Sequence, residues 1–449
     1  MSRSDLRSVA ARAGVDVLAP DYLPVPSGQA LEQEPELAPP RQPIAVFRPH
    51  SRARLRSPEA LERTQLRRVG LTWGLLVMNA LTWFGSALHI PGIVGHLIQQ
   101  GSLPLALLLA LTLNPRLKVR PNVLLSLTLL LVAEAVLTAL NPQYFGSIYR
   151  TIRLAEFVAA LWLLTPWWGR RDLLLVRYHL IAYGTILVSV ILGVFVAPGQ
   201  ALLGGRLAGT IWNMPPTQVA HYSAVTIGLV VVLWLCGKVT GRFTLVVSGV
   251  GGIILVLTHT RTALIGMMIG ILVAGMSLIV AKARVRKLFA AAGVTLVVGL
   301  LTLSGLLATW LARGEGTKEL TDLTGRTEVW GPLLALPRTP FQMIFGFGLS
   351  NSSFNGLSID SNWLASYDEQ GLFGVAICAL MLIFLFAKAY SRPRSVQRAL
   401  ALFLITYCLI ASFTEVGFTD VSTYLLELTL AASLLVPSAD GPGSVILNE

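Results

Sequence analysis

Long apolar runs make up most of this chain and limit what it can fold into. A helix needs about 20 apolar residues to cross about 30 Å of hydrocarbon. Twelve runs approach or exceed that length, at 70–90, 93–113, 122–140, 152–168, 176–197, 218–236, 243–258, 262–281, 288–312, 371–388, 399–414 and 421–437. The sequence therefore predicts an all-α polytopic membrane domain over 70–437 with about twelve transmembrane helices.

The composition agrees with a membrane location. Hydrophobic residues make up 54% of the 449 residues and charged residues only 13%, whereas soluble domains carry about 25% charged residues. Cys236, Cys378 and Cys408 all lie in apolar runs, where packing is their expected role. The sequence contains no P-loop, CxxC, paired metal-ligand histidines or dinucleotide fingerprint. We expect no metal, no cofactor and no nucleic-acid partner.

The two ends of the chain are polar. Residues 1–69 are rich in Pro, Ala, Glu and Arg and end in a basic run, which predicts a disordered cytoplasmic tail lying against anionic membrane lipids. A short amphipathic helix near 57–68 is compatible with the sequence. Residues 438–449 are expected to form a short cytoplasmic tail.

Positive charge alternates between the loops that join the runs. Short cytoplasmic loops carry an excess of Lys and Arg, and every second loop here has at least two such residues: 114–121, 169–177, 237–242, 281–287 and 388–398. Both termini are therefore predicted to be cytoplasmic in the plasma membrane. The longest polar segment, 313–365, then becomes an extracytoplasmic loop between the ninth and tenth spans, and long patterned loops are usually functional.

Few cations remain on the predicted outer face. Arg206 and Arg326 stand beside glycines, and Arg261 lies in the outer connection 258–262. Planar guanidinium groups bind phosphate oxygens bidentately, so these three arginines are candidates for holding a diphosphate. For Arg313 and Arg338 we expect side chains that extend to the membrane interface.

The order of these segments resembles the O-antigen ligase and Wzy-type polymerase superfamily. The similar segments are Arg206-x-x-Gly209 with Asn213-x-Pro215, Thr258-His259-Thr260-Arg261-Thr262-Ala263-Leu264, Gly325-Arg326-x-x-x-Trp330, Gly346-x-Gly348, and Asp360-x-x-x-Leu364 with Glu369-x-Gly371. The resemblance covers roughly residues 200–375.

The resemblance implies a GT-C-like fold and a metal-independent inverting glycosyltransferase. Its active site would lie at the outer face of the plasma membrane. The donor would be a glycan linked to polyprenyl diphosphate, and the acceptor a glycan or lipid-linked hydroxyl. Arg206, Arg261 and Arg326 would correspond to the arginines of the family that engage the donor diphosphate.

One position departs from the family. A histidine commonly stands four residues before the leucine matched to Leu364, and this chain has Asp360 there. Asp360 is our candidate general base, because a carboxylate within hydrogen-bond reach of a hydroxyl can accept its proton. The alternative is that Asp360 or Ser361 caps a helix beginning near Asn362.

Other residues are weaker candidates. His259, His221, Trp330 and Asn362 are predicted to contact substrate, and either histidine is an alternative base. Their ordinary roles would be packing for the histidines and interfacial anchoring for the tryptophan.

Several carboxylates are also candidates for a function. Glu415 and Asp420 are expected to line the acceptor side of the site. Glu134 and Glu427 lie within apolar runs, where carboxylates are costly. They either pair with each other, hold a membrane-facing hydrogen-bond network or belong to an ion path.

Polymerase and ligase remain alternatives, since both would use the same donor site. A lipid-linked oligosaccharide flippase or another polytopic transporter is the alternative of a different class, although no internal repeat is visible. Cell-wall SEDS polymerases share the layout but fit the arginine order less well.

Overall fold

A computed structural model describes residues 58–81, 86–88, 91–140, 147–170, 172–279, 285–287, 326–350 and 352–437. The regular secondary structure of the described residues consists of helices and one two-stranded hairpin. Residues 1–57 of the predicted tail, the predicted span 288–312 and the tail 438–449 lie outside the described residues.

Helices occupy the other predicted spans. The first of them starts earlier than expected, because α1 (Pro58–Met78) takes in the last twelve residues that we assigned to the tail. The others in the first half are α2 (Gly92–Leu113), α3 (Val123–Ala139), α4 (Ile148–Leu163) and α5 (Leu174–Val196). In the second half they are α7 (Pro216–Leu235), α8 (Gly241–Leu257), α9 (Arg261–Leu278), α14 (Asn362–Ser391), α15 (Val396–Ala411) and α16 (Thr423–Leu434).

Five of the described helices are long and apolar enough to cross a membrane, namely α2, α5, α7, α9 and α14. Four more apolar helices, α3, α8, α15 and α16, are shorter. This content is that of a multi-pass membrane protein.

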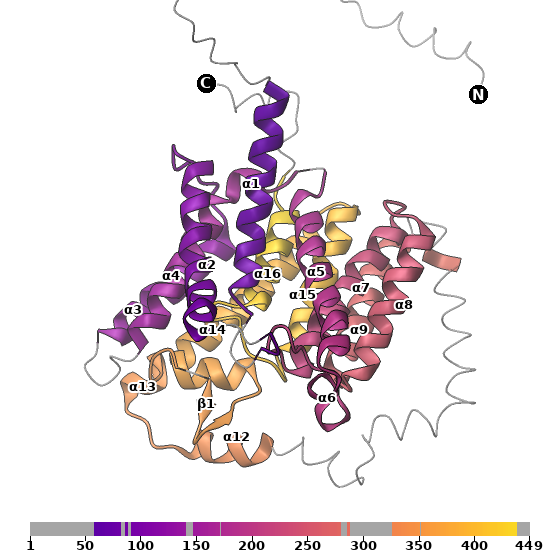
Figure 1. Cartoon of the computed structure of the whole chain (residues 1–449). Coiled ribbons are helices and arrows are strands. Elements are labelled where there is room, and N and C mark those ends of the chain that lie inside the picture. Colours follow the sequence, from indigo (N-terminus) through magenta and orange to yellow (C-terminus); the bar gives the residue numbers. More distant parts are fainter. Residues whose placement is uncertain are drawn as a thin grey trace, which may run out of the picture. The chain divides into compact units, whose positions relative to one another are not determined.

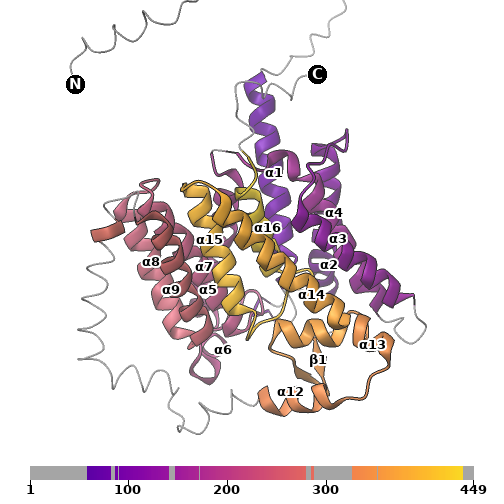
Figure 2. The ribbon, with the colours of Figure 1, turned by 180° about the vertical axis from the view of Figure 1, so that it is seen from behind.

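The helices pack in two groups on either side of the C-terminal helices. Helices α1 to α4 contact one another on one side, and α7, α8 and α9 pack together on the other (Figure 1). Helix α15 packs against α7, α9 and α16, and α14 packs against α3 and α15 (Figure 2). Helix α15 is therefore central, and eleven of its sixteen residues are buried, including all those from Ala399 to Cys408.

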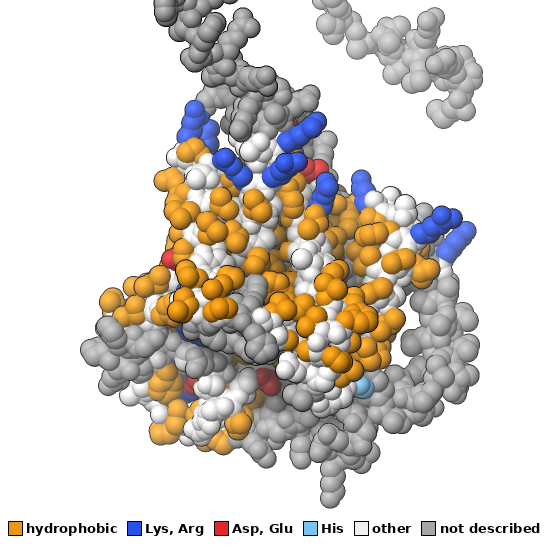
Figure 3. Space-filling view, in the orientation of Figure 1, with side chains coloured by type: hydrophobic (Ala, Val, Ile, Leu, Met, Phe, Trp, Pro, Cys, Tyr) orange, Lys and Arg blue, Asp and Glu red, His pale blue; other side chains and the backbone are white. Residues whose placement is uncertain are grey.

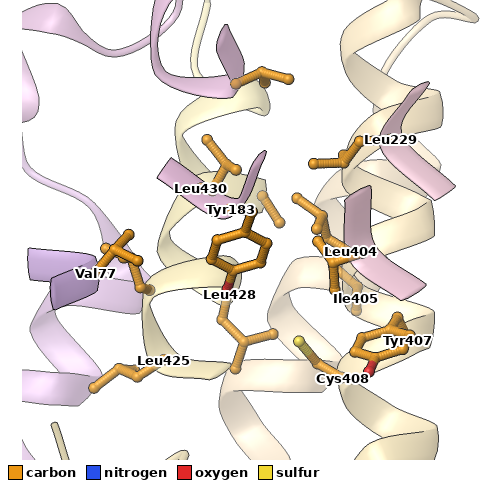
Figure 4. Packing of buried hydrophobic residues seen from close by; sticks show 14 of the residues in the cluster. Val77, Tyr183, Leu229, Leu404, Ile405, Tyr407, Cys408, Leu425, Leu428 and Leu430 are labelled. Carbon is orange, nitrogen blue, oxygen red and sulfur yellow. The ribbon is translucent and has the colours of Figure 1, made fainter. Parts of the chain in front are cut away.

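The core is apolar and closely packed where these helices meet. Figure 4 shows the cluster, in which α1, α5, α7, α15 and α16 contribute Val77, Tyr183, Leu229, Leu404 and Leu428. Phe403 lies against Gly228 of α7 and Gly270 of α9, where even a Cβ atom would come within 3 Å of its ring. Small residues at such contacts let membrane helices approach closely.

Positive side chains gather at one end of the helices. Figure 3 shows Lys and Arg at the end where α1 begins and an apolar surface below them. Contacts between loops support this grouping, because Asn114 donates to the carbonyl of Leu163 and Arg120 NH donates to Thr165 Oγ1. Predicted inner loops around Arg170, Lys238 and Arg392 also line one shared cavity. We call this the basic end and the opposite one the outer end.

The described part of the long polar loop has its own fold at the outer end. It contains α12 (Arg326–Ala335), α13 (Pro340–Phe345) and a hairpin of β1 (Ser353–Phe354) with β2 (Leu357–Ser358). Asn355 and Gly356 form the hairpin turn with φ of 51° and 81°. Positive φ at both positions is the requirement of a type I′ turn, which Asn-Gly satisfies.

Two glycines let this segment cross the start of α14. Gly346 follows the last residue of α13, and its NH donates to Gln342 O. Phe347 NH then donates to Asp368 O, and Gly348 NH donates to Glu369 O. Gly371 lies inside α14 with φ of 63°, and a Cβ there would come within 2.4 Å of the Ile344 carbonyl. The glycines of Gly346-x-Gly348 and Glu369-x-Gly371 therefore meet at one backbone crossing.

Arg338 stabilises the same backbone crossing through an ion pair and two aromatic contacts. Its Nη2 lies 2.8 Å from Asp368 Oδ1, and its guanidinium stacks on the rings of Phe347 and Tyr367. The side chain is 3% exposed. Our expectation that Arg338 extends to the membrane interface is therefore wrong, because a buried carboxylate and two aromatic rings hold its charge inside the protein.

Substitution of Gly371 tests the crossing. We expect Gly371→Ala to destabilise the protein by about 3 kcal/mol, because the left-handed backbone and the Ile344 carbonyl both oppose a side chain. Gly184→Ala in α5 is the matched control, since nothing lies within 4 Å of the added methyl group. Thermal unfolding in mild detergent measures both variants. Equal unfolding temperatures would contradict the crossing.

Candidate outer-face site

The loop between α15 and α16, residues 412–422, is contacted by α14 and α4 at the outer end. We call it the α15–α16 loop. Asn362 NH donates to Ser412 O, and Asn362 Oδ1 accepts from the NH groups of Gly417 and Phe418 at 3.1 and 2.8 Å. Arg150 of α4 pairs with Asp420 at 3.0 Å. Segments far apart in the sequence thus hold one short loop.

A cavity of about 260 Å³ opens beside this loop. We call it the outer cavity. Its walls come from the end of α1, the first two turns of α7, the loop and the start of α16, through Ala80, Pro215, Thr217, Gln218, His221, Glu415, Val416, Val421, Ser422, Thr423 and Tyr424. Of the residues predicted to contact substrate, His221 is the one among this lining. Glu415 lines it as well, whereas Asp420, the other carboxylate predicted for the acceptor side, is not among the lining residues.

Arg206 lies next to the cavity without lining it. Its Nε donates to Thr258 O at 2.9 Å and its Nη2 to Thr260 Oγ1 at 3.4 Å. Burial lowers the pKa of the guanidinium, and the negative charge of Glu415 opposes that shift. Arg206 is thus fixed on the outer connection between α8 and α9, close enough to Glu415 for their charges to interact.

Arg261 and His259 belong to the same connection. Arg261 is the first residue of α9, directly after the Thr260 that Arg206 contacts, and its Nε is buried with no hydrogen-bond partner among the described residues. His259 has φ of 50°, which turns the chain sharply before α9. Arg206 therefore contacts the residue that directly precedes Arg261 in the chain. Arg326 begins α12, but its side chain lies outside what the structure describes.

Asp360 and Asn362 lie on the other side of the α15–α16 loop. Asp360 accepts from Ser358 Oγ at 2.6 Å. Helix α14 begins at Asn362 as predicted, with Ser361 in the cap position but without a side-chain cap bond. Asn362 is 1% exposed, so its amide holds the loop from within the protein. Neither residue lines the outer cavity.

Trp330 packs in a small second core. Val329, Leu333, Ile359 and Ala365 form it, and Trp330 and Val416 cover it. Val416 also lines the outer cavity. This core therefore supports the cavity wall from behind, and the side chain of Trp330 is used for packing.

A buried polar network lies below the cavity. Glu427 is fully buried, and its Oε1 accepts from Tyr183 OH at 2.7 Å and lies 3.0 Å from His221 Nε2. His221 Nδ1 lies 3.1 Å from Tyr407 OH. Both ring nitrogens of His221 thus have protein partners, which favours a structural role over that of a free base.

Two carboxylates in apolar runs have different surroundings. Glu427 has a hydrogen-bond network, but the network is buried inside the protein and does not face the membrane as predicted. The predicted pairing of Glu427 with Glu134 is wrong. Both oxygens of Glu134 are buried without a hydrogen-bond partner in the described part of the chain. Sequence position alone could not separate these two residues.

Glu369 accepts hydrogen bonds from two serines of the polar loop. Its Oε1 accepts from the NH and the Oγ of both Ser350 and Ser352, at 2.8 to 3.1 Å. The carboxylate therefore organises the turn that leads into the hairpin.

The site also contains two polar residues that are not among those predicted from the sequence. Thr217 and Gln218 line the outer cavity from the first turn of α7, and Gln218 donates to Ala80 O and Tyr222 OH. The only sequence signal for them is a pair of polar residues directly after Pro215-Pro216 at the outer end of an apolar run.

Comparison with known proteins adds no relative. No protein-family model matches this chain, and no curated protein matches it.

The amide of Asn362 provides a test of how the site is held. We expect Asn362→Leu to destabilise the protein by about 2–4 kcal/mol, because two buried NH groups lose their acceptor. Ser361→Ala, one residue earlier, is expected to cost less than about 0.5 kcal/mol, because Ser361 makes no cap bond. Thermal unfolding of both variants measures the difference. If Ser361→Ala costs as much as Asn362→Leu, the loop is held in some other way.

Proposed function

We propose that the chain is a membrane glycosyltransferase of the O-antigen ligase and polymerase type. It would take glycan from a polyprenyl-diphosphate-linked donor and attach it to an acceptor hydroxyl at the outer face of the plasma membrane. The observation that carries the proposal is the position of Glu415, on the wall of the outer cavity and within electrostatic reach of Arg206. A proton acceptor and an anion-binding group thus stand together at the end opposite the cationic loops.

Arg206 and Arg261 are assigned to the donor diphosphate. Guanidinium groups bind such oxygens bidentately, and the partly buried setting of Arg206 strengthens the interaction. As the bond between the anomeric carbon and the diphosphate oxygen breaks, negative charge grows on that oxygen. Fixed positive groups stabilise this charge most in the transition state.

Glu415 is assigned to the acceptor. The acceptor oxygen forms the new bond to the anomeric carbon from the face opposite the leaving diphosphate, and its proton passes to the carboxylate. Asp360, the candidate from sequence, accepts a hydrogen bond from Ser358 and is not among the residues that line the outer cavity. We therefore assign the base to Glu415 and a positioning role to Asp360.

A transporter is the second candidate, and one observation favours it. His221 joins the outer cavity to Glu427, which in turn lies 3.9 Å from His179 Nε2. Chains of titratable groups inside a membrane are typical of proton-coupled transport. Uptake of lipid-linked glycan by sealed vesicles containing the purified protein, without glycosyl transfer, would select this function over the first.

Substitution of Arg206 tests the donor site. We expect Arg206→Lys to lower glycosyl transfer by about a hundredfold, because the amine keeps the charge and loses the planar fork. Arg242→Lys, an exposed cation at the start of α8, is the matched control and should leave the rate unchanged. Purified protein is incubated with polyprenyl-diphosphate-linked glycan and acceptor, and products are sized. A ladder indicates a polymerase and a single conjugate a ligase. An unaffected Arg206→Lys enzyme would reject the donor site.

The two candidate bases are separated by isosteric variants. Glu415→Gln is expected to slow transfer by about a hundredfold or more, because the amide accepts no proton. Asp360→Asn is expected to slow it by less than tenfold. The same assay, run between pH 5 and 9, measures both. The reverse order of the two effects would return the base to Asp360.

The orientation in the membrane has its own test. A cysteine placed at Asn355, in the hairpin turn, is expected to react with a membrane-impermeant maleimide on intact cells. A cysteine at Lys118, in a predicted inner loop, is expected to react only after the cells are opened. Cys236, Cys378 and Cys408 are replaced by alanine first. Labelling of the Lys118 position from outside would invert the topology.

A further inference from the structure

The basic end contains a larger cavity that the proposed function does not use. It measures about 370 Å³, and we call it the basic cavity. Its walls come from the turn before α5, the α7–α8 turn, the start of α15 and the end of α16. No acidic residue is among its lining residues, whereas Arg170, Lys238, Arg392 and Arg398 are.

We propose that the basic cavity binds the phosphate of an anionic ligand, with the headgroup of an anionic phospholipid as its source. Four cations from three separate connections, before α5, between α7 and α8, and at the junction of α14 and α15, lie around one cavity and form an electrostatic site that suits a phosphate group. Basic pockets between membrane helices at the cytoplasmic side are suited to anionic lipid headgroups.

The partners of the cations show which charges a ligand would meet. Arg170 is already paired with Asp172 at 3.0 Å and lies 4.0 Å from Glu62. Arg392 Nη2 donates to Leu435 O, and Arg398 Nη1 donates to Arg392 O. These are neutral carbonyl acceptors, so the charges of Arg392 and Arg398 are not neutralised by them. Arg398 Nε is buried with no hydrogen-bond partner among the described residues.

Two helix starts add positive potential to the same cavity. Helices α5 and α15 both begin at its wall, at Leu174 and Val396. Leu174 NH already donates to Asp172 Oδ1, and Arg398 NH donates to Ser395 Oγ. The contribution of these helix starts is therefore the dipole of each N-terminus, which favours anions. The end of α16 also contributes to the wall, but Gly169 NH and Arg392 already occupy its Ser433 and Leu435 carbonyls.

The apolar part of the lining favours a lipid over a free phosphate. Leu173, Leu174, Leu175, Val176 and Leu434 lie beside the cations, and a lipid would place its glycerol and upper acyl carbons against them. Inorganic phosphate would leave this apolar surface in contact with water.

Variants of an exposed and of a partly buried cation of the cavity lining, Lys238 and Arg398, test the proposal. Lys238 is exposed, so Lys238→Gln leaves the fold intact. Its matched control is Lys118→Gln, an exposed lysine of another loop of the basic end that is outside the cavity lining. Arg398→Gln removes the buried guanidinium, and Arg398→Lys restores the charge without the planar fork.

The full chain in phosphatidylcholine nanodiscs is titrated with phosphatidylglycerol, and bound lipid is counted by native mass spectrometry. We expect selective binding of phosphatidylglycerol, weakened about fivefold by Lys238→Gln, more than tenfold by Arg398→Gln and not at all by Lys118→Gln. Arg398→Lys should fall between wild type and Arg398→Gln.

Inorganic phosphate and glycerol 3-phosphate form the second arm. Binding of either one with the same dependence on Lys238, without selective lipid binding, would support the phosphate site and assign it a soluble source. Equal retention of phosphatidylglycerol and phosphatidylcholine, with neither soluble phosphate bound, would overturn the proposal. Equal effects of Lys238→Gln and Lys118→Gln would overturn it as well. None of these outcomes depends on glycosyl transfer.

Discussion

The amide of Asn362 is the interaction on which the outer end depends. Its Oδ1 accepts from two consecutive NH groups of the α15–α16 loop inside a buried environment. An unpaired buried NH costs about 1–3 kcal/mol, so the loop has one favourable path past the start of α14. That path places Glu415 at the cavity and Asp420 against Arg150. The position of the candidate chemistry is thus set by a residue that does not face the cavity.

The two ends of the helices differ in charge, and a buried network lies between them. Three of the four cations that line the cavity at the basic end, Lys238, Arg392 and Arg398, have no acidic partner among the described residues, while Arg170 pairs with Asp172. The outer end pairs carboxylates with arginines. Glu427 joins α16 to α5 and α7 through Tyr183 and His221. Such partners offset the free-energy cost of burying a carboxylate. The same bonds therefore fix the helices that carry the cavity walls.

The sequence predicted the helices well because hydrophobic length is a local property. The apolar run at 93–113 and the helix Gly92–Leu113 agree within one residue. The fold of the polar loop was not predicted, because it depends on contacts between distant segments. Asn355-Gly356 was a readable turn signal, but the contact of Gly371 with the Ile344 carbonyl is visible only in three dimensions. Arg338 was misjudged for the same reason, since Asp368 is thirty residues away in the sequence.

The residues that carry the family resemblance divide into two groups with different weight as evidence. Gly346, Gly348, Glu369 and Gly371 are explained by a backbone crossing and a turn, which any function would need. Their presence therefore supports the fold and says nothing about chemistry. Arg206 is different, because its hydrogen-bond partners are a carbonyl and a hydroxyl and not the carboxylate and aromatic rings that hold Arg338. Arg261 Nε is buried with no hydrogen-bond partner among the described residues. The case for glycosyl transfer rests on these two arginines and on Glu415 beside them, and the remaining segments only hold them in place.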